Sequence, residues 1–146
     1  GEALENLYAI ILNEHEANLI GKAFNMQIND KTAFAEELQR RFDLITIVTL
    51  GGIGSIVASH EGVYMVSPLK IKPIDTIGAG DAYTGYFCAA LDQGKSLEDA
   101  LRIASVAGSI ACTKVGAQTA LPMRDEVDKC VEQINIASLG HKQKTA

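Results

Sequence analysis

The sequence contains no tryptophan, only three prolines and only three cysteines among its 146 residues. Cys88, Cys112 and Cys130 are odd in number and lie far apart. A disulfide framework or a zinc site needs closely spaced pairs of cysteines, so we expect three reduced thiols. Internal repeats, low-complexity tracts and linkers are also missing.

Long apolar runs are missing as well. The longest, Leu44–Leu50, has the length of a strand, whereas a membrane span needs about 18 residues. The first ten residues lack the basic leader and apolar run of a secretory signal. Thirteen basic against 18 acidic residues give a net charge of −5, without the basic face of a nucleic-acid-binding protein. These absences predict a cytoplasmic protein that binds neither membranes nor nucleic acid.

The composition that remains is that of a globular protein. Hydrophobic residues make up 47% of the chain, and a length of 146 residues allows one domain with a buried core. We expect this domain to cover residues 1–138 and to be followed by a disordered tail at 139–146.

The order of predicted elements indicates the fold class. Strands are expected at Tyr8–Leu12 and Leu44–Leu50, with two helices between them, and a hairpin at Ser55–Val66. Three helices should follow, at about Asp81–Asp92, Leu97–Thr113 and Arg124–Ile136. This order predicts a layered α/β domain in which the first two strands pair in parallel.

Ligands of such sheets bind beyond the carboxyl ends of the strands. Asn13 and Gly51 occupy two of these ends. We therefore expect functional residues there.

The most informative segment is the glycine-rich run Asp75–Ala82, just before a predicted helix. Two glycines allow a tight turn whose N–H groups, together with the positive end of the helix, form an anion hole. A carboxylate at Asp81 would repel an anion there unless it accepts a proton from an attacking hydroxyl. From the spacing alone, capping of the helix by Asp81 is an equal alternative.

Two common glycine-rich motifs do not match. A Walker A loop needs Lys after its last glycine, and Gly78–Gly85 contains none. Gly51–Gly54 is an incomplete dinucleotide fingerprint followed by a strand-like run, so a tight turn between two strands is its alternative.

Three motifs together resemble the PfkB carbohydrate kinases, the ribokinase-like family. Asp75–Ala82 resembles the family's second signature, and Asn13–Glu16 its Asn-x-x-Glu element. Thr49–Gly54 resembles its Thr-x-Gly-x-x-Gly nucleotide loop. Gly116-Ala117-Gln118 followed by Pro122 is similar to the ribokinase branch of the family.

The motifs occur in the family's order, and the resemblance extends from about Tyr8 to Val131. It implies a layered α/β/α ribokinase-like fold and the ATP-dependent phosphorylation of a primary hydroxyl of a small sugar. D-ribose is the expected sugar, with adenosine, fructose or another small alcohol as alternatives.

The resemblance also implies residue roles. Asp81 would be the catalytic base, beside an anion hole for the γ-phosphate formed by Gly78, Ala79 and Gly80. Asn13 would contact the phosphates of ATP, and Ser105 would lie near the adenine. The nucleotide would be lined by Thr49, Leu50, Gly51, Gly52, Ile53 and Gly54, with Gly80 and Asp81.

Two metal ions are implied. Glu16 would order Mg²⁺, through water. A monovalent cation, K⁺, would be held mainly by backbone carbonyls at Asp75, Ile77, Ala111, Lys114, Gly116 and Ala120. Ala120 replaces the serine common in ribokinases, so one cation ligand is either missing or supplied by the backbone.

The family's N-terminal half, which carries the sugar-binding residues and a β-stranded lid, has no counterpart here. The chain therefore resembles only the C-terminal half of a sugar kinase. We expect the first strand to have an unpaired edge, through which the chain would form a homodimer or associate with the missing half. A nucleotide-binding module without turnover is the alternative function.

Overall fold

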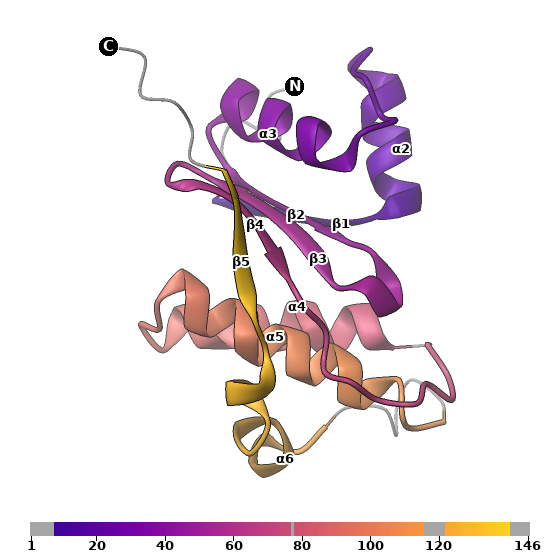
Figure 1. The fold of residues 1–146 in the computed structure, drawn as a ribbon, viewed down its shortest axis with the longest axis vertical. Helices are drawn as coiled ribbons and strands as arrows, with labels where there is room; N and C mark the ends of the chain where they lie inside the picture. Colours follow the sequence, from indigo (N-terminus) through magenta and orange to yellow (C-terminus); the bar gives the residue numbers. More distant parts are fainter. Residues whose placement is uncertain (1–7, 77, 116–121, 141–146) are drawn as a thin grey trace. The chain divides into compact units, whose positions relative to one another are not determined.

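The structure is a computed structural model that describes residues 8–76, 78–115 and 122–140 (Figure 1). The described residues fall into two compact units, and the single domain at 1–138 stays a prediction. The first unit extends to Met65 and includes the last strand from Ala137, and the second unit is Val66–Ile136.

The first unit is built on a five-stranded sheet with the order β1-β2-β3-β4-β5. As predicted, β1 and β2 pair in parallel, and β3 and β4 form a hairpin. Strands β2 and β3 pair antiparallel. The strand bounds are Ala9–Asn13, Ile45–Thr49, Ser55–Ser59, Gly62–Val66 and Ile136–Gly140.

Two helices, α2 (Glu14–Ala23) and α3 (Lys31–Phe42), connect β1 to β2. Asp30 caps α3 because its carboxylate accepts hydrogen bonds from the N–H groups of Thr32 and Ala33. The helix ends at Asp43, which has a left-handed conformation with φ 52°. Both predicted helices are therefore confirmed.

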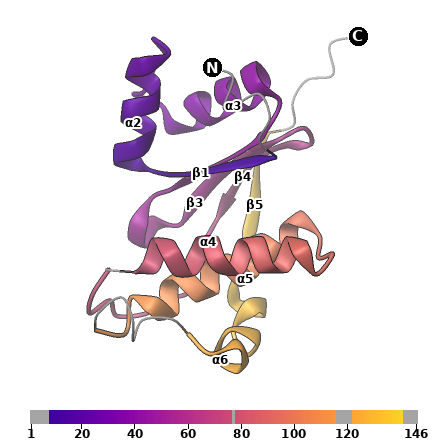
Figure 2. The ribbon, with the colours of Figure 1, turned by 180° about the vertical axis from the view of Figure 1, so that it is seen from behind.

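The core of the first unit lies between α2, α3 and one face of the sheet (Figure 2). Phe34 and Leu38 of α3 are fully buried, and they pack with Leu12 and Val48 from neighbouring strands. Burial of each such side chain contributes about 1.5–3 kcal/mol. Side chains alternate between the two faces along a strand, so Thr49, which follows the core residue Val48, is directed to the opposite face of the sheet.

The second unit contains α4 (Ala79–Asp92), α5 (Leu97–Ala111) and the short α6 (Arg124–Asp128). Helices α4 and α5 pack closely because small residues meet between them. A Cβ atom on Gly108 would lie 3.4 Å from the carbonyl oxygen of Ala79, so the backbones of the two helices approach closely there.

The predicted final helix at Arg124–Ile136 is wrong beyond Asp128. The chain continues as a 3-10 turn, Val131–Gln133, and then as β5. Two hydrogen bonds explain the change, because Asn135 O accepts from Ser67 N–H and Asn135 N–H donates to Ser67 Oγ. These contacts hold the backbone extended. Strand β5 reaches Gly140, two residues into the expected tail, and 141–146 lie outside the described residues.

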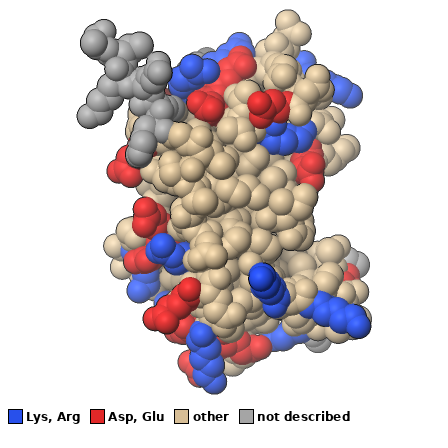
Figure 3. All heavy atoms as spheres, in the orientation of Figure 1, with Lys and Arg blue, Asp and Glu red and all other residues tan. Residues whose placement is uncertain are grey.

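No helix in the described part of the chain is long and apolar enough to cross a bilayer. Acidic and basic side chains are interspersed over the face drawn in Figure 3, which shows no continuous basic patch. The three cysteines are free, as expected.

Two helical glycines give a matched test of the packing. A Cβ atom on buried Gly21 would lie 2.0 Å from Ile28 Cγ2, whereas one on Gly85 would meet nothing within 4 Å. We expect Gly21→Ala to lower the free energy of unfolding, because overpacking costs about 1–3 kcal/mol. Gly85→Ala should raise it by about 0.5–1 kcal/mol, because alanine has the better helix propensity. Denaturant melts measure both effects, and a stabilised Gly21→Ala would contradict the packing of α2.

The edge at β1 gives a second prediction. Among the described residues, β1 has a neighbour on one side only, and its sequence Ala9–Asn13 carries no charge or proline to protect the open side. We expect the chain to associate through this edge and Ala9→Lys to weaken the association. Sedimentation velocity measures it, and Ser138→Lys on β5 is the control. Association that responds only to Ser138→Lys, or a monomer at all concentrations, would contradict the prediction.

Candidate functional site

The carboxyl ends of β1 and β2 bring two predicted site residues together. Asn13 is the register partner of Thr49, and Thr49 Oγ1 donates a 3.3 Å hydrogen bond to the carbonyl oxygen of Leu12. Asn13 Oδ1 accepts from the N–H of Glu16 at 2.8 Å, while Glu16 Oε1 accepts from the N–H of Asn13 at 3.0 Å. This reciprocal capping box fixes Asn13 and Glu16 at the start of α2.

The predicted nucleotide loop forms a tight turn between β2 and β3. Gly51–Ile53 is a single 3-10 turn, closed by a 2.8 Å bond from Leu50 N–H to Gly54 O. Gly51 and Gly54 have φ values of 62° and 115°, which only glycine adopts readily. Cβ atoms on Gly51 and Gly52 would meet nothing, so there is open space above the turn. A strand follows the turn, which excludes the dinucleotide fingerprint.

The glycine-rich run of the second unit starts α4. Gly78 is the N-cap residue, has φ 84°, and provides no side-chain cap. Asp81 lies in the first turn of the helix with an exposed side chain, and the structure shows no hydrogen bond or ion pair to its carboxylate. The capping alternative for Asp81 is therefore not what the structure shows. A Cβ atom on Gly80 would meet nothing, so space is open beside this helix end.

The segment that leads to α4 is anchored by α5. Leu69 N–H donates to the buried Ser109 Oγ at 3.1 Å. The N–H groups of Ile74 and Asp75 both donate to the carbonyl oxygen of Cys112, at 2.7 and 3.0 Å. No residue pattern predicts these contacts, because their donors are backbone N–H groups and one acceptor is the backbone carbonyl of Cys112.

The described part of the predicted K⁺ site fits a cation. Asp75 N–H donates to the carbonyl oxygen of Cys112, the C-cap residue of α5; Ala111 precedes Cys112 as the last residue of the helix, and Lys114 follows two residues later. The C-terminal end of a helix carries partial negative charge, which favours cations. Ala111 O accepts one hydrogen bond, from Lys114 N–H, and each carbonyl has two lone pairs. The predicted ligands Ile77, Gly116 and Ala120 lie outside the described residues.

The donor set also fits Mg²⁺ as the resemblance implies. Among the described residues, no three His, Cys, Asp or Glu side chains cluster as a metal site. Mg²⁺ is commonly bound by one or two carboxylates, water and substrate phosphates, so a complete protein cage is not required. Glu16 is exposed, and its second carboxylate oxygen makes no contact in the structure.

Near Cys112, burial raises the pKa of the thiol and the negative charge of Asp75 raises it further. Cys112 is half-buried, which is consistent with the reduced thiol that the sequence predicts.

Helix α6 is bound to the end of α5 by an ion pair. Lys114 Nζ lies 3.0 Å from Glu126 Oε1, which also accepts a hydrogen bond from Met123 N–H at 3.0 Å. Tyr86 of α4 donates from its hydroxyl to Pro122 O at 2.7 Å, and burial raises the pKa of Tyr86. The sequence analysis assigned no role to Glu126 or to this hydroxyl.

Ser105, predicted near the adenine, is only 8% exposed within α5. The structure describes its burial and shows no hydrogen bond of its hydroxyl. Its role stays a prediction.

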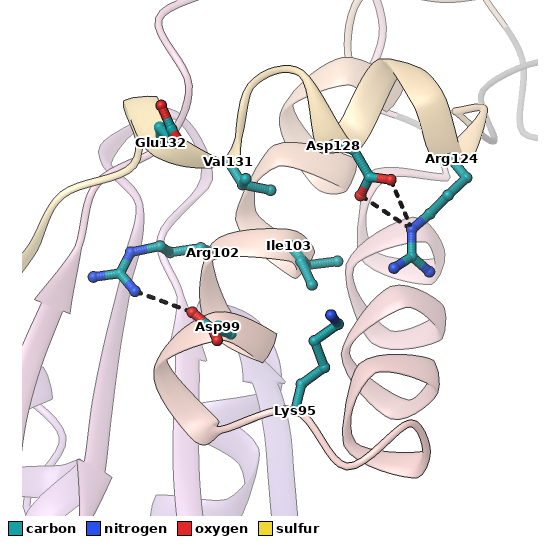
Figure 4. A pocket seen from close by; sticks show the side chains of 8 residues that line it. All are labelled: Lys95, Asp99, Arg102, Ile103, Arg124, Asp128, Val131 and Glu132. Atoms are coloured by element: carbon teal, nitrogen blue, oxygen red, sulfur yellow. Dashed lines mark hydrogen bonds and ion pairs between the residues drawn. The ribbon is translucent and has the colours of Figure 1, made fainter.

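An open pocket of about 560 Å³ lies between the start of α5, α6 and the turn after it (Figure 4). None of the predicted site residues lines it. Its charges largely neutralise one another, because Arg102 pairs with Asp99 at 3.4 Å and Arg124 with Asp128 at 3.1 Å. The pocket is thus separate from the predicted site residues.

The Glu126 contacts predict a pH dependence. Hydrogen bonds from Met123 N–H and from Lys114 hold the pKa of Glu126 below that of a free glutamate. A carboxylate with a lowered folded-state pKa stabilises the fold above its unfolded pKa, and this contribution disappears as the pH falls through the folded pKa. We expect Glu126→Gln to lower the melting temperature at pH 7 and to match the wild type near pH 3. Glu132→Gln, at an exposed residue, is the control. An equal loss at both pH values would contradict the ionic explanation.

Known proteins are similar to this chain in amino-acid sequence. Residues 2–124 match the profile described as "pfkB family carbohydrate kinase". The ribokinase of Lactococcus lactis is 35% identical over 101 residues, which are 69% of this chain and 34% of that protein.

Solved structures are similar as well. A ribokinase from Thermotoga maritima superimposes with a TM-score of 0.84 and 30% identity, covering 90% of this chain and 44% of that one. The ribokinase of Arabidopsis thaliana, solved with ribose and ATP, gives 0.77 and 28%, covering 90% and 43%. The chain thus spans less than half the length of the proteins it matches, and its α/β fold is ribokinase-like, as predicted.

The profile covers most of the chain, and the Asn-x-x-Glu element, the glycine turn after β2 and the glycine-rich start of α4 all lie within the match. This chain belongs to the pfkB family of carbohydrate kinases.

Proposed function

We propose that the chain carries the nucleotide and catalytic-base residues of an ATP-dependent sugar kinase, with D-ribose as the sugar. One observation carries the proposal: α4 begins at a glycine turn without a side-chain cap, and Asp81 in its first turn is exposed and unpaired. An unpaired carboxylate beside a positive helix end is suited to take a proton while negative charge develops nearby.

The mechanism follows from these groups. Asp81 accepts the proton of the sugar's primary hydroxyl, and the hydroxyl oxygen forms a bond to the γ-phosphorus of ATP. The bond between this phosphorus and the β,γ-bridging oxygen breaks, and ADP leaves. The amides of Gly78 and Gly80 stabilise the charge on the transferred group, since phosphoryl transfer depends mainly on positioning and electrostatics. The Ala79 N–H donates to Thr76 O at 3.2 Å, so it must leave this bond to take part.

Most of the proposed nucleotide residues belong to the first unit, where Asn13 contacts the phosphates and the open turn Thr49–Gly54 lines the nucleotide. Ser105 of α5, proposed near the adenine, belongs to the second unit, as do Gly80 and Asp81. Support comes from the open space at Gly51 and Gly52 and from the capping box that fixes Asn13.

Two metal ions are proposed in supporting roles. Glu16 would order Mg²⁺, which would supply positive charge against the phosphates when bound. Asp75 and the carbonyl groups after α5 would hold K⁺. Both assignments rest on the fit of the donor groups described above.

The acceptor identity rests on similarity to ribokinases, one of which was solved with ribose and ATP. Phosphorylation of adenosine, fructose or another small alcohol by the same residues is the alternative. Nucleotide binding without turnover is a second candidate function, supported by the open space at Gly51 and Gly52.

Asp81→Asn tests the catalytic assignment. In a coupled ADP-release assay with ribose, we expect it to lower turnover at least about 100-fold, the typical contribution of a general base. Titration calorimetry should find ATP affinity retained. Asp92→Asn, at the other end of α4, is the matched control because that carboxylate is also exposed.

Turnover that survives Asp81→Asn would contradict the role of Asp81. A wild-type chain that binds ATP but does not phosphorylate ribose, adenosine or fructose would support the binding module instead.

A further inference from the structure

A third polar residue lies in line with Asn13 and Thr49. The register pairs Asn13 with Thr49 across β1 and β2, and Thr49 with Ser55 across β2 and β3. Register partners in a sheet share a face. Ile56 and Ala58 belong to the core under α2 and α3, so Ser55 is directed to the opposite face, as Thr49 is.

The hydroxyl of Ser55 has no partner in the structure. The residue is 2% exposed, and its Oγ is buried without a hydrogen bond. A buried polar group in this state is destabilising and calls for an explanation. Ser59, on the same face of the same strand, differs: its Oγ donates to Gly62 O and accepts from Glu61 N–H.

Gln39 Oε1 of α3 and Thr46 Oγ1 of β2 are also buried without a partner, but Thr46 lies on the same face of its strand as the core residues Leu44 and Val48. Ser55 is the one of these three residues that lies at the end of a strand beside the glycine turn.

We propose that Ser55 is a further nucleotide-contacting residue, whose hydroxyl donates a hydrogen bond to a phosphate oxygen of ATP. The inference rests on the proposed function. A phosphate group is the expected acceptor, because its oxygens only accept and Asn13 of the same row is assigned to the phosphates. For this contact, the Ser55 side chain must rotate about χ1 so that its hydroxyl leaves the buried position. The preceding residue, Gly54, has a φ of 115°.

Titration calorimetry of the chain with Mg·ATP tests the inference. We expect Ser55→Ala to raise the Kd for ATP about 10-fold, because a hydrogen bond to a charged group is lost. The Kd for adenosine should not change. The melting temperature of the ligand-free variant should stay equal or rise, because the unpaired hydroxyl has been removed.

Two control variants separate contact from folding. Ser59→Ala removes a buried hydroxyl that has partners, so it should lower the melting temperature and leave ATP affinity unchanged. Ser55→Thr keeps the hydroxyl and should bind ATP almost as the wild type does.

The outcomes are distinct. A wild-type chain that binds no ATP would overturn both this inference and the nucleotide assignment of the proposed function. Wild-type binding with an unchanged Kd in Ser55→Ala would overturn the Ser55 contact alone. Equal losses for ATP and adenosine would also overturn it, because the hydroxyl would not then act on the phosphates.

Discussion

Parallel pairing of β1 with β2 is the constraint on which the first unit depends. Two parallel neighbours cannot be joined by a hairpin, so α2 and α3 must return the chain to the start of the next strand. Their apolar sides then form the core with one face of the sheet. The same pairing places the ends of both strands together, which makes Asn13 the neighbour of Thr49. The parallel pairing thus positions the core residues and also places the polar residues Asn13 and Thr49 side by side.

The second unit depends on the last turn of α5. The carbonyl oxygen of Cys112, the C-cap residue, accepts hydrogen bonds from the N–H groups of Ile74 and Asp75. The hydroxyl of Ser109 accepts one from the N–H of Leu69. Gly108, which has no side chain, allows α4 to approach closely. These contacts bind the segment that precedes α4, whose N-cap residue is Gly78. Asp81, in the first turn of the helix, is exposed. A helix end with an unpaired carboxylate is consistent with proton transfer and with a binding site for an anion.

The sequence predicts local features well and non-local contacts poorly. Hydrophobic periodicity located α2, α3 and the hairpin, and the Asn-x-x-Glu spacing anticipated residues that form a capping box. The final helix was overestimated because Asn135 bonds to Ser67, a contact 68 residues away in sequence. Ser55 gave no signal for a similar reason, since its place beside Thr49 depends on strand register.

The central claim is that Asn13 and the open turn Thr49–Gly54 bind a nucleotide. An NMR titration of the ¹⁵N-labelled chain with Mg·ATP tests it most directly. The predicted result is that the amide signals of Asn13 and of Thr49–Gly54 shift and saturate with a single Kd. Shifts confined to the residues of the pocket in Figure 4 would contradict the claim.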